Sequence, residues 1–247
     1  MSIQLKVLTY NIRHGKGTDR IISLKRIADV LRKSGAQLIG LQEVDRNMPR
    51  SNFIFQAQYL AYLLGMNYVF SPASKWFRVF EFGNAILSKY PIIKYNNVLL
   101  PGQGEQRALL EAVLSVNNQK IKFFNTHLGL SNTARELQVN KIIELLGNLC
   151  LPTILAGDFN VLPSDPVIIK LAQFFGYCDN SSAANTKTFP SNAPSVKIDY
   201  IFLSPHWKLL SLKTLSSEAS DHLPLLGEVE LIASYPKLII KCPNQIV

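Results

Sequence analysis

The sequence is poor in cysteine and has no long apolar run. The three cysteines, Cys150, Cys178 and Cys242, are widely spaced and form no CxxC pair. This spacing indicates neither a disulfide framework nor a thiolate zinc site, and it favours a reducing compartment. No HExxH motif is present, which argues against a zinc site built from closely spaced histidines. No stretch approaches the length of a transmembrane helix, so we expect no integral membrane segment.

A secretory signal is also missing from the N-terminal residues. Residues 1–10 alternate polar and apolar side chains and lack the charged and apolar regions of a signal peptide. Together with the few cysteines, this pattern predicts a cytoplasmic protein. A peripheral contact with a membrane stays open, because the segment from Tyr235 to Val247 is moderately apolar.

Charged residues make up only 17% of the 247 residues, but 26 Lys and Arg against 17 Asp and Glu give a net charge of +9. An excess of this sign favours anionic partners such as nucleic acid, phosphorylated metabolites or acidic lipid headgroups. A merely basic surface is the equal alternative, because the cations are scattered and form no nucleic-acid-binding arm. The length and the 47% hydrophobic content predict a single domain over residues 1–247, with a core at about 5–232 and a tail at 233–247.

Apolar runs alternate with amphipathic segments along the chain. Spacing and end signals predict helices at residues 24–33 (stopped by Gly35), 55–64 (stopped by Gly65), about 133–146 (a capping box of Thr133 and Glu136) and 166–175 (capped by Asp165). Short apolar or alternating runs predict strands at residues 5–10, 38–41, 84–87, 108–116, 120–125, 154–156, 198–203, 209–214 and 225–232. Residues 181–195 have the composition of a surface loop. This order predicts sheets packed face to face with helices on their outer sides.

Six short polar islands interrupt or follow the apolar runs. They are Tyr10-Asn11, Gln42-Glu43, Asn125-Thr126-His127, the GDFN sequence at 157–160, Ile198-Asp199-Tyr200 and Ser220-Asp221-His222. Taken singly, such an Asp is most often a cap or turn former, and such a His a packed side chain. Together, carboxylates and amides at several strand ends can converge on one sheet edge and offer the oxygen ligands that Mg²⁺ prefers.

The motifs TYN, LQEV, GNAILS, NTHLG, GDFN, IDYIFLS and SDHLPL occur in this order over about residues 5–232. Because it contains these motifs in this order, the chain resembles the endonuclease/exonuclease/phosphatase superfamily, which includes deoxyribonuclease I. The resemblance implies an α+β fold, a four-layer α/β/β/α sandwich with two packed, mainly antiparallel or mixed sheets. It also implies a Mg²⁺-dependent phosphoesterase, with Mn²⁺ as a possible substitute.

The resemblance assigns roles to particular residues. Glu43 resembles the main Mg²⁺ ligand, supported by Asn11, and Asp221 the carboxylate placed near the metal. Asp158 resembles the residue that orients or deprotonates the attacking water, and Asn160 the amide that binds a phosphate oxygen. His222, held by Asp199, and His127 resemble the two active-site histidines. Two further residues are candidates of lower rank. Asn84 could position His127 or a phosphate oxygen, which is favoured slightly over a turn role, and Arg107 could pair with substrate phosphate, although a structural ion pair is at least as well indicated.

We therefore expect a divalent-metal-dependent phosphodiesterase in which water attacks phosphorus in line, acting as a monomer on nucleic acid, a phospholipid headgroup or an inositol phosphate. The alternative is a catalytically silent module of the same fold that binds phosphate or nucleic acid. The basic aromatic stretch Lys75-Trp76-Phe77-Arg78 could grip a ligand, but an anchored loop with two buried rings is the favoured interpretation.

Overall fold

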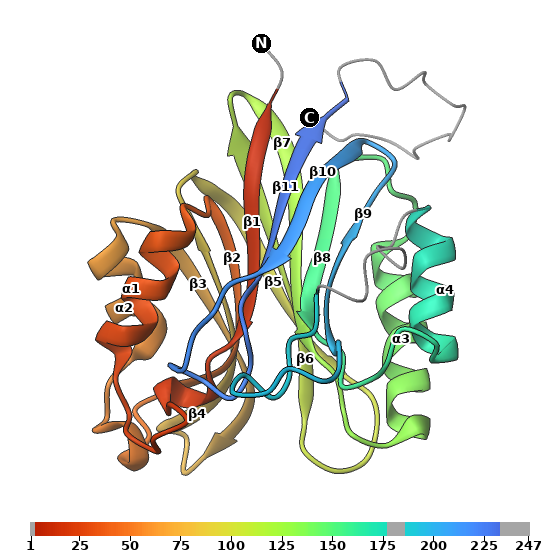
Figure 1. The fold of residues 1–247 in the computed structure, drawn as a ribbon. Coiled ribbons are helices and arrows are strands. Elements are labelled where there is room, and N and C mark those ends of the chain that lie inside the picture. Colours follow the sequence, from red (N-terminus) through yellow and green to blue (C-terminus); the bar gives the residue numbers. More distant parts are fainter. Residues whose placement is uncertain (1–2, 177–185, 233–247) are drawn as a thin grey trace.

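Two β-sheets lie face to face in the computed structural model, which describes residues 3–176 and 186–232. Helices α1 and α2 cover the outer face of one sheet, and α3 and α4 cover the other (Figure 1). This is the four-layer α/β/β/α sandwich expected from the sequence. In the described part, the first sheet has the order β10-β11-β1-β2-β4-β3 and the second β5-β6-β7-β8-β9.

Most strands pair antiparallel, but each sheet contains one parallel pair, β1 with β2 and β7 with β8. The strands of the first sheet are β1 (Gln4–Asn11), β2 (Leu38–Arg46), β3 (Asn67–Trp76), β4 (Phe80–Ser88), β10 (Trp207–Thr214) and β11 (Leu225–Leu231). Those of the second are β5 (Ile92–Leu100), β6 (Arg107–Val116), β7 (Gln119–His127), β8 (Thr153–Asp158) and β9 (Asp199–Leu203). Strands β3 and β5 are absent from the sequence-based expectation, because both are sheet edges with irregular burial and give little alternation.

The helices follow the end signals of the sequence. Helix α1 (Leu24–Ser34) is capped by Ser23 and ends at Gly35, which adopts a left-handed φ of 66°. Helix α2 (Gln56–Leu64) likewise ends at Gly65, and α4 (Pro166–Phe175) is capped by Asp165. All four predicted helices are therefore confirmed.

Helix α3 (Asn132–Leu146) begins earlier than its capping signal suggested. The Oγ of Ser131, not of Thr133, accepts the hydrogen bond from the backbone N–H of Ala134 at 3.2 Å. The predicted capping box of Thr133 and Glu136 is wrong, because Ser131 offers the same cap one half-turn earlier and leaves Thr133 inside the first turn.

A polar bridge crosses the apolar layer between the sheets. Asn125 on β7 donates from Nδ2 to the carbonyls of Leu41 and Ala85 on the opposite sheet, both at 2.9 Å. Its Oδ1 accepts from Gln42 Nε2 at 2.6 Å. A side chain at Gly40 would collide with this amide, since a Cβ there would lie 2.9 Å from Asn125 Oδ1. Buried amides with these partners fix how one sheet is placed on the other.

Cys150 is disulfide-bonded, a bond that the spacing of the cysteines did not indicate. The tail at 233–247 and residues 181–185 of the expected surface loop lie outside the described residues. Among the described helices, none has the length and apolar character needed to cross a membrane.

Candidate active site

The carboxylate of Asp158 is the centre at which the predicted residues meet. It is fully buried at the end of β8, in register with His127 on β7 and Asp199 on β9. Its Oδ2 accepts from Asn11 Nδ2 at 3.0 Å and lies 3.5 Å from His127 Nε2 and 3.6 Å from His222 Nε2. The ends of strands from both sheets therefore converge on one oxygen atom.

The environment of Asp158 suits a base that works near neutral pH. Burial and the neighbouring charge of Asp199 raise its pKa to about 7, although His222 and the hydrogen bond from Asn11 oppose the change. A carboxylate with a pKa in this range is a much better proton acceptor than an ordinary aspartate. Its Oδ1 accepts from the backbone N–H of Asn160 at 3.0 Å, which fixes the orientation of the carboxylate.

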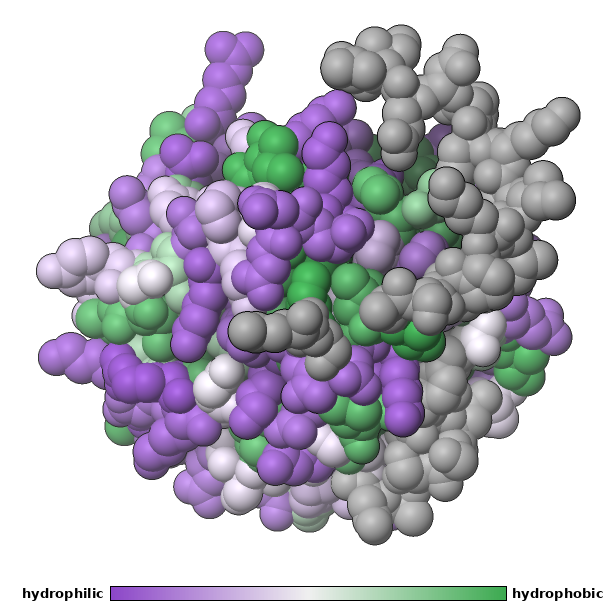
Figure 2. Space-filling model, turned by 90° about the horizontal axis from the view of Figure 1, so that it is seen from above, coloured by the Kyte–Doolittle hydropathy of each residue, from purple (hydrophilic) through white to green (hydrophobic). Residues whose placement is uncertain are grey.

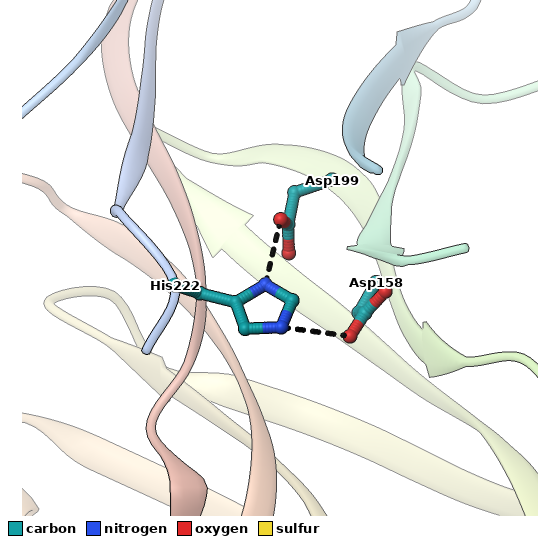
Figure 3. A group of neighbouring side chains, drawn as sticks. All are labelled: Asp158, Asp199 and His222. Carbon is teal, nitrogen blue, oxygen red and sulfur yellow. Dashed lines mark hydrogen bonds and ion pairs between the residues drawn. The ribbon is translucent and has the colours of Figure 1, made fainter. Parts of the chain in front are cut away.

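His222 carries a proton on both ring nitrogens at neutral pH. Its Nδ1 lies 2.9 Å from Asp199 Oδ2, and its Nε2 points to Asp158 (Figure 3). Burial opposes the charged form, but the carboxylates of Asp199 and Asp158 outweigh burial and raise the pKa of His222 to about 10. The residue is therefore a buried cation at the centre of the site.

The ring of His127 is neutral, whereas that of His222 is positively charged. Its Nδ1 lies 3.1 Å from Arg107 Nη1, and because a guanidinium can only donate, this nitrogen must accept. The proton of the neutral ring then sits on Nε2, which faces Asp158. Burial and the charge of Arg107 hold the pKa of His127 well below its usual value. His127 is thus a neutral hydrogen-bond donor.

Glu43 reaches the site from a bulge in β2. The pairing register shifts between Leu41 and Val44, and Glu43 adopts a left-handed φ of 55°, which is uncommon for this residue type. Asn11 Nδ2 donates to Glu43 Oε1 at 3.0 Å, so Asn11 joins Glu43 to Asp158. Burial and the nearby charge of Asp221 raise the pKa of Glu43, although Asn11 opposes the change.

Arg13 is a site residue that the sequence did not reveal. Its Nε lies 3.2 Å from Asp221 Oδ2, and its backbone N–H donates to Asn11 Oδ1 at 3.0 Å. Like Glu43 it has a positive φ, here 44°. The sequence feature that could have indicated Arg13 is its position close after the Tyr10-Asn11 island. The backbone turn that brings it to Asp221, 208 positions later, is not visible in the sequence.

The two amides near the edge of the site bond to backbone carbonyls. Asn84 Nδ2 donates to the carbonyl of Ala108 at 3.0 Å, and Asn160 Nδ2 donates to the carbonyl of Leu128 at 3.0 Å. Asn84 lines a small pocket with Glu43, Arg107 and His127. All ten predicted site residues therefore lie in or around one region, although Arg107 and Asn84 contact protein groups.

Residues 186–196 support the site from behind, which the sequence did not indicate. Thr188 Oγ1 accepts from the backbone N–H of Asp199 at 3.4 Å, and the Thr188 carbonyl accepts from Leu223 at 2.7 Å. The ring of Phe189 lies 5.0 Å from that of His222. Thr186 and Thr188 are fully buried, so this part of the expected surface loop is an internal support for Asp199 and His222.

The favoured interpretation of the stretch from Lys75 to Arg78 is wrong. Trp76 is 44% exposed and Phe77 is 88% exposed, so neither ring is buried. Trp76 is the last residue of β3, and Phe77 begins the turn that leads to β4.

A comparison with known proteins shows to which protein family this arrangement of residues belongs. Residues 8–222 match the model of the endonuclease/exonuclease/phosphatase family. The chain belongs to this family. Its members are hydrolases of phosphate esters and typically need a divalent metal.

Relatives of the family agree in fold over nearly the whole chain. The chain is 28% identical to the uncharacterized protein YbhP of Escherichia coli K12, over 92% of this chain and 96% of that one. A family structure from Beutenbergia cavernae has a TM-score of 0.79 at 21% identity, covering 92% of this chain and 72% of the other. The mannosyl-6-phosphatase of Bacteroides thetaiotaomicron has a TM-score of 0.73 at 22% identity, covering 91% and 99%.

The side chains of this family member fit a divalent cation. Burial and the charge of Asp221 raise the pKa of Glu43, and the carboxylate of Asp221 lies 3.2 Å from Arg13 Nε and accepts a hydrogen bond from Ser220 Oγ at 3.3 Å. A cation between such carboxylates removes their repulsion. The buried group of Asp158, Asp199 and His222 also brings possible ligand atoms within 4.8 Å of one another. However, both ring nitrogens of His222 already face carboxylates, with Nδ1 2.9 Å from Asp199 Oδ2 and Nε2 3.6 Å from Asp158 Oδ2, so Glu43 and Asp221 fit the ion better.

Proposed function

We propose that the protein is a Mg²⁺-dependent phosphodiesterase in which Asp158 prepares a water molecule for in-line attack on phosphorus. The observation that carries this proposal is that Asp158 Oδ2 lies 3.5 Å from His127 Nε2 and 3.6 Å from His222 Nε2, with Arg107 on Nδ1 of the first ring and Asp199 on Nδ1 of the second. Such a set holds a base, a cation and a neutral donor within one small volume, and phosphoester hydrolysis requires these three parts.

Each residue has one part in the proposed reaction. Asp158 accepts the proton of the water as the new oxygen–phosphorus bond forms. The ester bond on the opposite side of phosphorus breaks, and the leaving oxygen departs as an alcohol after taking a proton from solvent water. His222 places its positive charge beside the phosphate oxygens, where negative charge increases in the transition state, and Asp199 keeps that charge in place. His127 and Asn160 donate hydrogen bonds to the same oxygens, and Arg107 holds the required tautomer of His127.

The metal would be held by Glu43 and Asp221, with Asn11 orienting Glu43. When bound, Mg²⁺, or Mn²⁺ in its place, supplies positive charge that neutralises phosphate oxygens. The amide oxygen of Asn11 accepts from Arg13, so Asn11 contributes mainly by joining Glu43 to Asp158.

The number of ester bonds on phosphorus distinguishes the substrate of the proposed diesterase from that of a monoesterase. The mannosyl-6-phosphatase among the related structures is named for a sugar phosphate, so a phosphomonoester is the competing substrate class. A catalytically silent binding module is the competing function. It is disfavoured because the residues that the proposed reaction uses are all present, and the side chains of Asn11, His127 and His222 meet at Asp158 Oδ2.

A substrate panel with a matched variant tests the proposal. The panel contains abasic DNA, single-stranded RNA, sphingomyelin, inositol phosphates and a chromogenic diester and monoester, each with Mg²⁺, Mn²⁺ or chelator. We expect metal-dependent turnover of a diester, and we expect Asp158→Asn to lower kcat by about 10²- to 10⁴-fold. Turnover of no ester with either metal would support the binding module, and equal rates for Asp158→Asn would remove Asp158 as the base.

Location and oligomeric state complete the proposal. We propose that the protein is a monomer and lies in the cytoplasm. The scarce cysteines support this location, whereas the disulfide at Cys150 favours an oxidising compartment. Fractionation of cells and thiol labelling of Cys150 in intact cells separate the two: a Cys150 thiol that reacts in the cytosolic fraction supports the cytoplasmic assignment.

A further inference from the structure

Large apolar side chains are exposed around the end of the molecule that carries the site. The loops that follow β1, β2, β7 and β8, and the β3–β4 turn, all lie at the end where Asn11, His127 and Asp158 are found (Figure 1). These segments expose Ile21, Phe53, Trp76, Phe77, Val79, Leu130 and Leu162. Apolar groups gathered in this way mark a surface that meets an apolar partner.

The most prominent of these groups form an aromatic tip, which we define as Phe53, Trp76, Phe77 and Val79. Phe53 is 61% exposed, Phe77 88% and Val79 52%. Phe80 supports the tip from below, with its ring 6.3 Å from each of the rings of Phe53 and Phe77. The tip is therefore a supported projection of the β3–β4 turn and the loop before α2.

Positive charge surrounds the aromatic tip. The exposed cations there are Arg46, Arg50, Lys75 and Arg78. Arg46 and Lys75 share the single carboxylate of Glu81, at 3.1 and 2.8 Å, and Arg50 pairs with Asp45 at 2.7 Å. Three of these cations thus share two carboxylates, and the charge of Arg78 adds to the local positive excess.

The opposite end of the molecule has a different surface. Figure 2 looks onto that end and shows mainly hydrophilic side chains, with green patches separated by purple ones.

We propose that the aromatic tip docks into the surface of a lipid bilayer that contains anionic phospholipid, with the site facing the headgroups. Tryptophan and phenylalanine insert at the boundary between headgroups and acyl chains, and neighbouring Lys and Arg are attracted by anionic lipid. Single-stranded nucleic acid fits less well, because Ile21, Val79, Leu130 and Leu162 are aliphatic and offer no ring on which a base can stack.

The docking has a consequence for the substrate class, which rests on the proposed function. With the site end against a bilayer, the ester offered to Asp158 is the phosphodiester of a lipid headgroup. The docking itself needs no catalysis and can be measured without turnover.

Flotation with vesicles tests the docking. The full chain is mixed with phosphatidylcholine vesicles, with vesicles containing phosphatidylglycerol, or with single-stranded RNA as competitor. We expect binding to the anionic vesicles, weaker binding to the neutral ones, and a loss of about tenfold or more in the double variant Trp76→Ser/Phe77→Ser. Tyr62→Ser is the matched control, because Tyr62 is 82% exposed on α2, away from the tip, and should bind as the unaltered chain does.

The outcomes separate docking from catalysis. The docking proposal is overturned if the unaltered chain fails to float, if the double variant binds like Tyr62→Ser, or if RNA binds more tightly than the vesicles and displaces them. The double variant should hydrolyse a soluble diester at the normal rate while losing activity on vesicle-borne lipid. Vesicle binding without turnover of any ester would retain the docking and refute the proposed function.

Discussion

His127 and His222 approach the same oxygen of Asp158 from the two different sheets, at 3.5 and 3.6 Å, yet one is neutral and the other charged. His127 ends a strand of the second sheet, and His222 precedes β11 of the first. Both rings are buried to the same degree, 6% exposed. The difference comes from the residue behind each ring, which is Arg107 for His127 and Asp199 for His222.

The comparison teaches how one site obtains a donor and a cation from the same residue type. A cation behind the ring makes Nδ1 an acceptor and disfavours a second proton, while a carboxylate behind the ring favours that proton. Both arrangements direct an N–H toward Asp158. Changing the residue behind each ring should therefore change its charge without moving it.

Replacing Asp199 with asparagine should have the largest effect. The pKa of His222 loses its main raising cause and falls, because burial then dominates. We expect kcat to fall about 10²- to 10³-fold near neutral pH. The sign of the pH effect is fixed: His222 must be protonated, so activity should be lost at a lower pH than in the unaltered enzyme. An unchanged alkaline limb of the pH–rate profile would refute the role of Asp199.

Stability should report the charge of His222 independently of activity. Its folded pKa of about 10 lies above its ordinary value, so the stabilisation is complete below about pH 6.5 and is lost as the pH rises toward 10. Thermal unfolding between pH 6.5 and 10 should therefore show a steeper fall in Tm for the unaltered chain than for His222→Gln, by a few degrees. His206→Gln is the control, because burial lowers the pKa of His206 and its charge does not change in this range. Parallel curves for all three proteins would contradict the assignment.

Replacing Arg107 should convert His127 toward the state of His222. Arg107→Glu places a carboxylate behind the ring, so the pKa of His127 should rise, as followed by NMR titration of the ring. A second cation beside Asp158 weakens the base, and we expect kcat to fall about tenfold. Arg107→Gln keeps an N–H donor for Nδ1 and should lose less activity. Equal losses in both variants would show that Arg107 acts only through packing.

The contact between Phe189 and His222 should have the smallest effect. The rings lie 5.0 Å apart, so the protonated imidazole faces an aromatic ring. Phe189→Leu keeps apolar bulk but removes the contact between the charged imidazole and an aromatic ring. Because the loss of one such contact has a small energetic effect, we expect kcat to fall about two- to threefold. A loss as large as that of Asp199→Asn would indicate instead that the segment around Phe189 has moved.

Much of the fold was readable from local signals. Gly35 and Gly65 end their helices as expected, and the apolar run before Asp158 forms β8. The edge strands β3 and β5 were not predicted, because exposed edge strands lack a regular alternation of buried side chains. The cap of α3 was misplaced because Ser131 and Thr133 are both good cap residues and only the chain path chooses between them.

The site also has residues that the sequence could predict and contacts that it could not. The polar islands identified Glu43, Asp158, Asp199 and His222, because their residue types and order resemble the family motifs. The contact of Arg13 with Asp221 and the support from Thr188 were not predictable, since each joins segments far apart in the sequence. The exposure of Phe77 was likewise missed, because an aromatic residue in a sequence is more often buried than projecting.

The sequence by itself determined the residue types that do the chemistry, the periodicities that form the sheets and helices, and the family. Only the tertiary structure decided the surroundings of each histidine, the burial that raises the pKa of Asp158 and the face that carries the aromatic tip. The physical reason is that pKa and exposure depend on what surrounds a group in space. Asp158 becomes a base near neutral pH only when folding removes water and brings the charge of Asp199 beside it.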